Sequence, residues 1–206
     1  MITRCVPLIG VLLLFAIAGG WRPWLQRRRT GSSGFCMFRS GGLGPRLRDA
    51  GAVVAFTLIL AQAVAAAGWP RSLSPLIVRD GPTGMLLYAV GAGLMFAGIV
   101  LLVTGQLHLG ASWRIGIEAG AKPGLVTDGL YRHSRNPIFL ALLMFVAGYT
   151  LMLPTILSFV LLAGMYVGIR QQVAAEEAWL IDTYGEAYRD YAGRVGRFVP
   201  GMGKLQ

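Results

Sequence analysis

The sequence feature that most constrains the fold is an apolar run over residues 137–169, in which 33 consecutive positions carry no charge. As one continuous helix this run would be about 50 Å long, whereas the hydrocarbon core of a bilayer is about 30 Å thick. Pro154 lies near its centre, and a proline inside a helix removes one backbone donor. We therefore predict two short membrane spans, over 138–152 and 155–170, joined by a tight turn.

The composition places the rest of the chain in the same class. Hydrophobic residues make up 55 % of the sequence and charged residues only 14 %, whereas a soluble domain carries about 25 % charged residues. These values exclude a water-soluble globule, a disordered chain and a coiled coil. Three further apolar segments, 5–21, 50–69 and 84–108, are candidate spans. We expect an all-α integral membrane protein with about five transmembrane helices.

Two of these apolar segments carry a further signal in their sequence. Segment 5–21 is short, so it could be a cleaved signal peptide instead of a span. We favour the span because a cluster of arginines over 22–29 follows it directly, and such a cluster opposes export. In the segment 84–108, Gly93 and Ala97 have the small-residue spacing that is typical of close helix packing.

The basic residues orient the chain. The net charge is +10, and 16 of the 19 Lys and Arg residues fall in 22–48, in 109–136 or in the tail from 170. Five spans with an outside amino terminus place all three segments in the cytoplasm, as the positive-inside rule requires. The charge therefore indicates a membrane and not a nucleic acid as the partner. We expect 22–48, which is rich in Gly, Ser and Arg, to be a basic loop without regular structure.

Segment 125–139 is the first of two stretches with candidate chemistry. Gly129 permits a turn, and Asn136 precedes Pro137 at the predicted start of a helix, where an asparagine side chain can cap the helix. The backbone N–H groups at this helix start, with Arg132 and Arg135 nearby, suit an anion such as a carboxylate. The same residues could instead form a basic anchor at the membrane interface.

Segment 176–191 is the second stretch, and it continues from the last span without a helix breaker until Gly185. Glu176 and Tyr184 fall on one helical face. Glu176 and Glu177 are adjacent carboxylates beside a membrane, where they are costly unless they meet a cation or a donor. They could also belong to a solvated helix start.

Together the two stretches resemble the isoprenylcysteine carboxyl methyltransferase family, which includes relatives that act on phospholipids. The matching pattern is Leu-Val-x-x-Gly-x-Tyr-x-x-x-Arg-(His/Asn)-Pro-x-(Tyr/Phe) at 125–139, a helical hairpin, Glu-Glu-x-x-Leu from 176, Tyr-Gly-x-x-Tyr-x-x-Tyr at 184–191 and Arg-Phe-x-Pro at 197–200. The resemblance implies a membrane methyltransferase domain over 49–206 with its motif core at 110–200. A first span and a basic cytoplasmic loop, at 1–48, precede this domain. The resemblance also implies a cytoplasm-facing site with a cytoplasmic carboxy-terminal amphipathic helix, in the inner or plasma membrane if the chain is bacterial.

The resemblance implies S-adenosylmethionine as the cofactor, bound between the loop before the fourth span and the helix after the fifth. Leu125 and Val126 would offer backbone groups to adenine, Tyr131 and Phe139 would supply aromatic walls, and Glu176 would bind a hydroxyl or ammonium group. By matched motif position, the implied cofactor contacts are Pro123, Gly124, Leu125, Val126, Tyr131, Asn136, Pro137, Ile138, Phe139 and Glu176.

Two positions depart from the family pattern. The family often has histidine where this chain has Asn136, and asparagine can donate a hydrogen bond but cannot become charged at neutral pH. Relatives that act on prenylcysteine have an arginine four residues before the first glutamate, where it meets the substrate carboxylate. Here that position is Gln172, and Arg170 lies about 200° away around the helix. The second departure disfavours prenylcysteine itself as the acceptor.

We predict a lipophilic acceptor that reaches the site from the bilayer, between the third span and the 137–169 hairpin. A carboxylate is favoured because it is already nucleophilic. An amine would need a proton acceptor, for which Glu177 is the candidate. Arg135 and Glu177 are the predicted catalytic residues, and Arg114 and Arg170 are the predicted substrate-binding residues.

Several alternatives stay open from the sequence. The chain could be a phospholipid amine N-methyltransferase, a nicotinamide-dependent membrane reductase of the sterol type, or a non-enzymatic membrane module such as a carrier. We expect no metal site, because His108 and His133 have no acidic or cysteine partners in the sequence pattern. The acceptor atom (oxygen, nitrogen or sulfur) and the oligomeric state are not determined by the sequence.

Overall fold

The computed structural model describes residues 2–38, 42–69, 73–76, 81–113 and 124–205. Within these ranges the chain is almost entirely helical and forms no β-strand. Two short 3₁₀ turns, η3 (Gly110–Ser112) and η4 (Gly129–Arg132), lie between helices. The helices are α1 (Ile2–Phe15), a π-helical turn η1 (Ala16–Trp21), α2 (Arg22–Thr30), α3 (Leu43–Gly68), α4 (Pro82–Leu109), α5 (Pro137–Met152), α6 (Ile156–Tyr184) and α7 (Glu186–Arg194).

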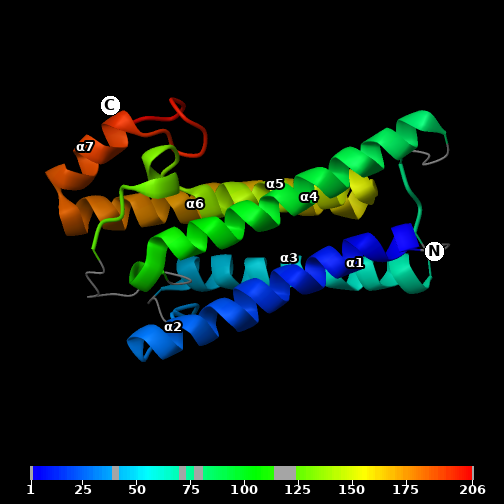
Figure 1. Ribbon diagram of the computed structural model, residues 1–206, viewed down its shortest axis with the longest axis horizontal. Helices are drawn as coiled ribbons and strands as arrows, with labels where there is room; N and C mark the ends of the chain where they lie inside the picture. The colour runs from blue at the N-terminus through cyan, green and yellow to red at the C-terminus, as the bar shows by residue number, and fades with distance from the viewer. Residues whose placement is uncertain (1, 39–41, 70–72, 77–80, 114–123, 206) are drawn as a thin grey trace.

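The long helices lie side by side and antiparallel (Figure 1), so the two termini lie at opposite ends of the molecule. α1, η1 and α2 follow one another without a break and form a single rod. Four helical segments, Arg4–Thr30, Leu43–Gly68, Pro82–Ser112 and Ile156–Tyr184, are long and apolar enough to cross a membrane, and Pro137–Met152 is a shorter apolar helix. The prediction of an all-α membrane protein with about five spans is confirmed.

The predicted hairpin is also confirmed. α5 ends at Met152 and α6 begins at Ile156, with Pro154 in the turn between them. Thr155 caps α6, because its hydroxyl accepts a hydrogen bond from the Ser158 backbone N–H at 3.1 Å. The proline interrupts the helix ladder, and the capping threonine starts a new helix at once.

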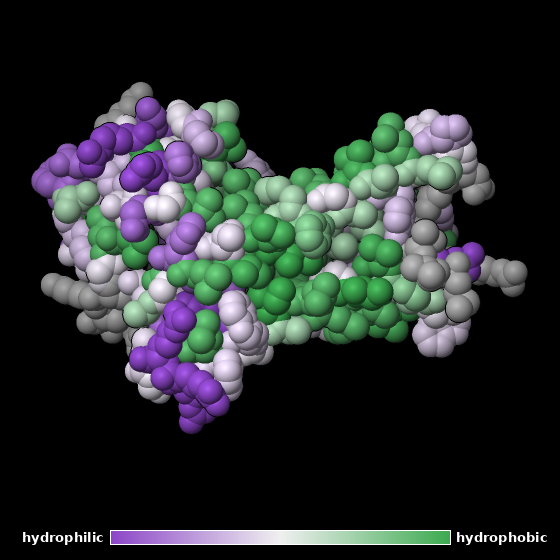
Figure 2. Space-filling model, viewed as in Figure 1, coloured by the Kyte–Doolittle hydropathy of each residue, from purple (hydrophilic) through white to green (hydrophobic). Residues whose placement is uncertain are grey.

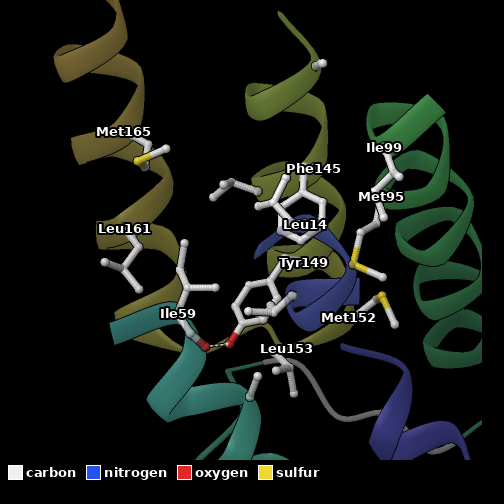
Figure 3. Close-up of a cluster of buried hydrophobic side chains, with 14 of the residues drawn as sticks. Leu14, Ile59, Met95, Ile99, Phe145, Tyr149, Met152, Leu153, Leu161 and Met165 are labelled. Atoms are coloured by element: carbon white, nitrogen blue, oxygen red, sulfur yellow. Dashed lines mark hydrogen bonds between the residues drawn. The ribbon is translucent and has the colours of Figure 1, made fainter. Parts of the chain in front are cut away.

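A buried polar cluster fixes the hairpin against α3. The Tyr149 hydroxyl donates to the Ile59 carbonyl and to Gln62 Oε1, each at 3.0 Å, and Gln62 Nε2 donates to the Thr155 hydroxyl. Figure 3 shows the bond between Tyr149 and Ile59 beneath the surrounding apolar side chains. Because every member has a partner, this cluster joins α3, α5 and α6 without leaving a buried polar group unpaired.

The core contains residues from the first helix as well as from the other four. Leu14 of α1, Ile59 of α3, Met95 of α4, Phe145 of α5 and Met165 of α6 belong to one cluster of buried apolar side chains (Figure 3). On the face shown in Figure 2, apolar residues cover the middle of the bundle, and hydrophilic residues gather at the end that carries α2 and α7. The basic segments of the sequence therefore lie largely at one end of the bundle.

The prediction of an irregular loop over 22–48 is wrong at both ends of that range. Residues 22–30 continue the first rod as α2, and α3 already begins at Leu43. Arginine is a good helix former, so a basic composition by itself does not indicate a loop. α2 ends at Gly31, whose φ of 77° is the left-handed conformation that terminates helices.

The small residues that pack closely are not the predicted ones. An added Cβ at Gly93 would meet no atom within 4 Å, whereas one at Gly98 would lie 2.8 Å from the Ala141 carbonyl oxygen. An added Cβ at Gly91 would lie 2.7 Å from the Gly148 carbonyl oxygen, and one at Gly105 would lie 3.1 Å from a side-chain carbon of Ile138. These three glycines recur every seven residues, which is close to two helical turns and keeps them on one face. They form a glycine seam along which α4 and α5 pack closely, with backbone contact at Gly91 and Gly98.

We expect the glycine seam to be intolerant of side chains. The substitution Gly98→Ala should lower the free energy of unfolding by about 1–3 kcal/mol, because the new methyl group meets backbone atoms that cannot move aside. Gly93→Ala is the matched control and should be neutral or stabilising by about 0.5–1 kcal/mol through helix propensity. Thermal unfolding in detergent measures both, and equal melting temperatures for the two variants would contradict the seam.

Candidate functional site

A cavity of about 1080 Å³ lies at the polar end of the bundle and extends along its helices. Its polar part is formed by the loop before α5, by the end of α6 and by α7. Its apolar arm is formed by α1, η1, α3 and α6, with residues of α4 and α5 beside them. The residues that line the polar part include Gln106, Trp113, Gly124, Leu125, Val126, Tyr131, Arg135, Asn136, Gln172, Glu176, Trp179, Tyr184, Tyr188 and Tyr191, and those of the arm include Leu14, Phe15, Gly51, Ala55, Leu58, Leu161, Gly164, Met165 and Gly168.

The loop before α5 is positioned by a turn at Gly129. Its φ is 57°, and an added Cβ would lie 2.9 Å from His108 Nδ1. The same ring nitrogen accepts a hydrogen bond from the Leu130 backbone N–H at 3.2 Å. His108 therefore fixes the loop to the end of α4, and the next residue, Tyr131, is buried with its ring at the cavity wall.

Asn136 occupies the residue before α5 but does not cap the helix, contrary to the prediction. Its side chain makes no capping bond, and its Nδ2 instead donates to the Arg197 carbonyl at 3.1 Å. Its own backbone N–H donates to the Ser134 hydroxyl. The asparagine amide therefore connects the start of α5 to the carboxy-terminal segment, a contact that only the folded chain creates.

Arg135 is the most completely bonded side chain of the site. Its five N–H donors make five hydrogen bonds: two to Glu177 Oε1, at 2.8 and 3.0 Å, and one each to the carbonyls of Ala192, Val195 and Gly203. Arg197 binds the same carboxylate, with its Nη2 at 2.6 Å from Glu177 Oε2. Glu177 is 5 % exposed and lies between two guanidinium groups.

This network braces the site and leaves no free donor on Arg135. It joins the loop before α5, the extension of α6 and the segment after α7. Glu177 accepts from an arginine on each of its two oxygens, so both oxygens are occupied. The two residues predicted to be catalytic therefore lie in contact with each other, and their bonds go to the protein.

Glu176 lies on the cavity wall, one position before the braced glutamate. It is half-buried, and its Oε1 accepts a hydrogen bond from Gln172 Nε2 at 2.8 Å. Trp179 and Tyr184 follow on α6 and pack edge to face with ring centroids 6.3 Å apart. The Tyr184 hydroxyl is buried at the cavity and makes no hydrogen bond within the ranges that the structure describes.

Three tyrosines of the polar part, Tyr131, Tyr188 and Tyr191, are neutral aromatic walls. The Tyr191 hydroxyl donates to the Tyr131 carbonyl at 2.7 Å. Burial raises the pKa of Tyr191 to about 12, and it also raises the pKa of Tyr131 and of Tyr188 above the ordinary phenol range. The phenolate form is disfavoured because it would lose its hydration, so these groups donate hydrogen bonds and do not accept protons near neutral pH.

The structure brings together most of the residues predicted to contact the cofactor. Pro137 is buried at the start of α5 behind the cavity wall, and Pro123 lies outside the described residues. The predicted cofactor residues that line the cavity are Gly124, Leu125, Val126, Tyr131, Asn136, Ile138, Phe139 and Glu176.

Of the two predicted substrate-binding arginines, one lies away from the cavity and the other lies outside the described residues. Arg170 is exposed on α6, where its Nη1 lies 3.3 Å from the Tyr166 hydroxyl and its guanidinium stacks 6.0 Å from that ring. It does not line the cavity. Arg114 lies outside the described residues.

Sequence reasoning missed the part of the wall that comes from the first rod and from the end of α4. Trp113 is 2 % exposed, and the Arg22 guanidinium carbon lies over its indole, 4.6 Å from the ring centroid of Trp113. Arg22 also donates to the carbonyls of Gln106 and Gly110. The sequence signal for this wall is Arg22, which directly follows an apolar segment. The prediction of a loop over 22–48 hides this signal.

The apolar arm involves both helices of the predicted hairpin and the end of α4. The glycine seam brings α4 and α5 together at Gly91 and Gly98, but Leu102 of α4 and Leu142 of α5 line the cavity. The arm is also lined by α3 and by α6, the second helix of the hairpin, with α1 and η1 beside them. The route from the bilayer between the third span and the hairpin therefore stays a prediction.

Comparison with known proteins agrees with the motifs. Residues 86–187 match the phospholipid methyltransferase family model. The chain is 29 % identical over 77 residues to the protein-S-isoprenylcysteine O-methyltransferase of Schizosaccharomyces pombe, which covers 37 % of this chain and 33 % of that protein. It is 31 % identical over 115 residues to methanethiol S-methyltransferase 1 of Bradyrhizobium diazoefficiens, which covers 51 % of this chain and 39 % of that protein. The chain thus spans about a third to two fifths of the length of these curated relatives.

The fold is similar to a solved structure of the eukaryotic intramembrane Ras methyltransferase, isoprenylcysteine carboxyl methyltransferase. The TM-score is 0.62 at 18 % identity, over 95 % of this chain and 66 % of that one. The fold and the paired motifs are similar to those of integral membrane methyltransferases. Within this class, the comparisons confirm the resemblance of the chain to the isoprenylcysteine carboxyl methyltransferase family.

We expect Arg135→Lys to damage the site and the fold together. Lysine keeps the charge but cannot reach Glu177 and three carbonyls at once, so the free energy of unfolding should fall by about 2–4 kcal/mol. Arg194→Lys is the control and should change it by no more than about 0.5 kcal/mol, because Arg194 is exposed. Thermal unfolding in detergent measures both. An Arg135→Lys variant that melts with the wild type would contradict the bracing role.

Proposed function

We propose that this chain is an integral membrane methyltransferase that transfers a methyl group from S-adenosylmethionine to a carboxylate on a lipophilic acceptor. We also propose that the site faces the cytoplasm, because the basic segments lie largely at the end of the bundle that carries it. One observation carries the proposal. A single cavity joins the motif residues of the polar part to an apolar arm that runs along the membrane helices.

The polar part of the cavity fits the methyl donor. The carboxylate of Glu176 can bind an ammonium or hydroxyl group, and the buried Tyr184 hydroxyl has no hydrogen-bond partner in the described part of the chain. Tyr131 and Trp179 can cover an adenine ring. Leu125 and Val126 are half-buried residues of the cavity wall, and their backbone groups can recognise the edge of that ring. When bound, S-adenosylmethionine supplies an electrophilic methyl group on a positively charged sulfur.

The apolar arm fits an acceptor with a long apolar tail. Gly51 of α3 and both Gly164 and Gly168 of α6 line the arm, and an added Cβ at any of the three would meet no atom within 4 Å. The missing side chains leave the arm open along its length. A tail that moves from the bilayer into this arm stays in an apolar environment, so no apolar surface becomes exposed to water. An acceptor as small as methanethiol would leave most of the arm unfilled.

The state of the polar groups favours a carboxylate over an amine as the acceptor. An ammonium group must lose a proton before it can be methylated, which requires a base. Both oxygens of Glu177 are bound by Arg135 and Arg197. Burial raises the pKa of Tyr131, Tyr188 and Tyr191, which keeps these three phenols neutral. A carboxylate needs no base, because it is already deprotonated and nucleophilic near neutral pH.

Methyl transfer to lipid tests the proposal. The purified chain in lipid nanodiscs is incubated with S-adenosylmethionine carrying a radiolabelled methyl group and with a total lipid extract. We expect label in the organic phase that alkali releases, because methyl esters hydrolyse in base. Alkali-stable label would indicate methylation at nitrogen or sulfur and would contradict the carboxylate acceptor. Saturable binding of a reduced nicotinamide, without binding of S-adenosylmethionine, would support the reductase alternative instead.

We expect Glu176→Ala to weaken binding of the methyl donor. Loss of one charged hydrogen bond should lower the affinity by about 1.5–3 kcal/mol, which is roughly a 10- to 150-fold rise in Kd. Glu186→Ala is the matched control, because Glu186 is exposed on α7 and lies outside the cavity. Calorimetry with S-adenosylmethionine measures both variants. An unchanged Kd for Glu176→Ala would remove this residue from the donor site.

A further inference from the structure

We infer that Arg48 binds the carboxylate of the acceptor and that Gln172 positions the Arg48 guanidinium, an inference that rests on the proposed function. The starting observation is a contact between two distant parts of the chain. Arg48, in the second turn of α3, places its Nε 3.3 Å from Gln172 Oε1 on α6, and both side chains line the cavity. The sequence predicts a loop over 22–48, whereas Arg48 lies in a helix that faces the cavity.

Arg48 is the cavity-lining cation with donors to spare. Among the described residues, the other basic side chain on the cavity wall is Arg135, and all five of its donors are occupied by protein groups. The two terminal nitrogens of Arg48 make no hydrogen bond within the described ranges, and no carboxylate there lies within ion-pair distance of them. A planar group with two free donors matches the two oxygens of a carboxylate.

The adjacent acidic residue does not neutralise Arg48. Asp49 also lines the cavity, but its Oδ2 accepts a hydrogen bond from the Phe38 backbone N–H at 2.6 Å. Consecutive residues of a helix point about 100° apart, which separates the two charged groups. The Arg48 charge is therefore available to an anionic ligand in the cavity.

Gln172 has one possible orientation, because its two neighbours have opposite hydrogen-bonding character. Arginine only donates, so the Gln172 carbonyl oxygen must face Arg48, and a carboxylate only accepts, so the Gln172 amino group must face Glu176 at 2.8 Å. The row Arg48–Gln172–Glu176 thus runs from a positive to a negative end. The negative end suits the positively charged methyl donor, and the positive end suits an anionic acceptor.

The surroundings of Arg48 match an amphiphile with an anionic head. Gly51, Ala52 and Ala55 follow Arg48 on the cavity side of α3, at spacings of three, four and seven residues, and these small residues line the apolar arm. A head group held at Arg48 therefore lies directly above the arm that would receive its tail. Membrane-facing arginines at such an interface keep their charge in the polar layer.

The chemical step that follows is balanced without a base. One oxygen of the carboxylate held by Arg48 forms a bond to the methyl carbon, and the bond between that carbon and sulfur breaks. The sulfur keeps the electron pair and loses its positive charge, while the carboxylate becomes a neutral methyl ester. No proton moves. The neutral ester then binds Arg48 less strongly than the carboxylate did, which favours its release into the bilayer.

A swap of the two side chains tests the inference in the full chain reconstituted in nanodiscs. The probes are S-farnesylcysteine and dodecanoate, each with its carboxamide as an uncharged competitor. We expect Arg48→Gln to raise KM for the carboxylates about 10- to 100-fold. The Kd for S-adenosylmethionine and the inhibition by the carboxamides should not change. Arg46→Gln is the control, because Arg46 is an exposed neighbour that does not line the cavity.

The double variant Arg48→Gln with Gln172→Arg returns a guanidinium to the same place from the opposite helix. Its KM for the carboxylates should be at least about tenfold lower than that of Arg48→Gln. A merely structural defect would not be repaired in this way. An unchanged KM in Arg48→Gln, or equal weakening of carboxylate and carboxamide, would overturn the inference. Wild-type protein that methylates a phospholipid amine and no carboxylate would overturn it but leave the methyltransferase function standing. Wild-type protein that does not bind S-adenosylmethionine would overturn both.

Discussion

The buried guanidinium of Arg135 is the interaction on which the geometry of the site depends. Its bonds to Glu177 and to three carbonyls hold the loop before α5, the extension of α6 and the carboxy-terminal segment in one arrangement. A single glutamate lies between Arg135 and Arg197, so part of the positive charge is compensated by carbonyl dipoles. Removing one partner would leave a buried charge unpaired, which costs far more than the pair contributes. The motif arginine and glutamate thus form the frame of the cavity, while Glu176 faces its interior.

The apolar part of the cavity depends on an asymmetry in helix packing. Gly91 and Gly98 let α4 and α5 approach until their backbones touch. α3 and α6 instead leave space at Gly51, Gly164 and Gly168. Glycines therefore have opposite effects in the two places. Between α4 and α5 the facing helix fills the space that a side chain would take, whereas between α3 and α6 that space is part of the cavity. Sequence spacing alone does not separate these cases, because both sets consist of glycines in apolar helices.

The first rod contributes to the site although the family match begins only at residue 86. Arg22 supplies donors to the carbonyls at the end of α4, where the helix leaves its last acceptors unpaired, and it stacks on Trp113. Leu14 and Phe15 line the apolar arm, and Phe15 packs edge to face on Phe56. The segment outside the matched region therefore shapes the pocket that would receive the acceptor. Differences in this segment are a physical route by which relatives with the same motifs could select different acceptors.

The sequence by itself determined the membrane class, the hairpin and the residues of the two motifs. These follow from local properties: the length of an uncharged run, a proline at its centre, and helical spacing over 176–184. Only the tertiary structure decided that Asn136 binds the Arg197 carbonyl instead of capping α5, and that Arg135 is fully occupied. It also decided the contact of Arg48 with Gln172, which are 124 positions apart. Such contacts depend on the relative rotation and depth of whole helices, which packing of the complete core determines and which no local pattern records.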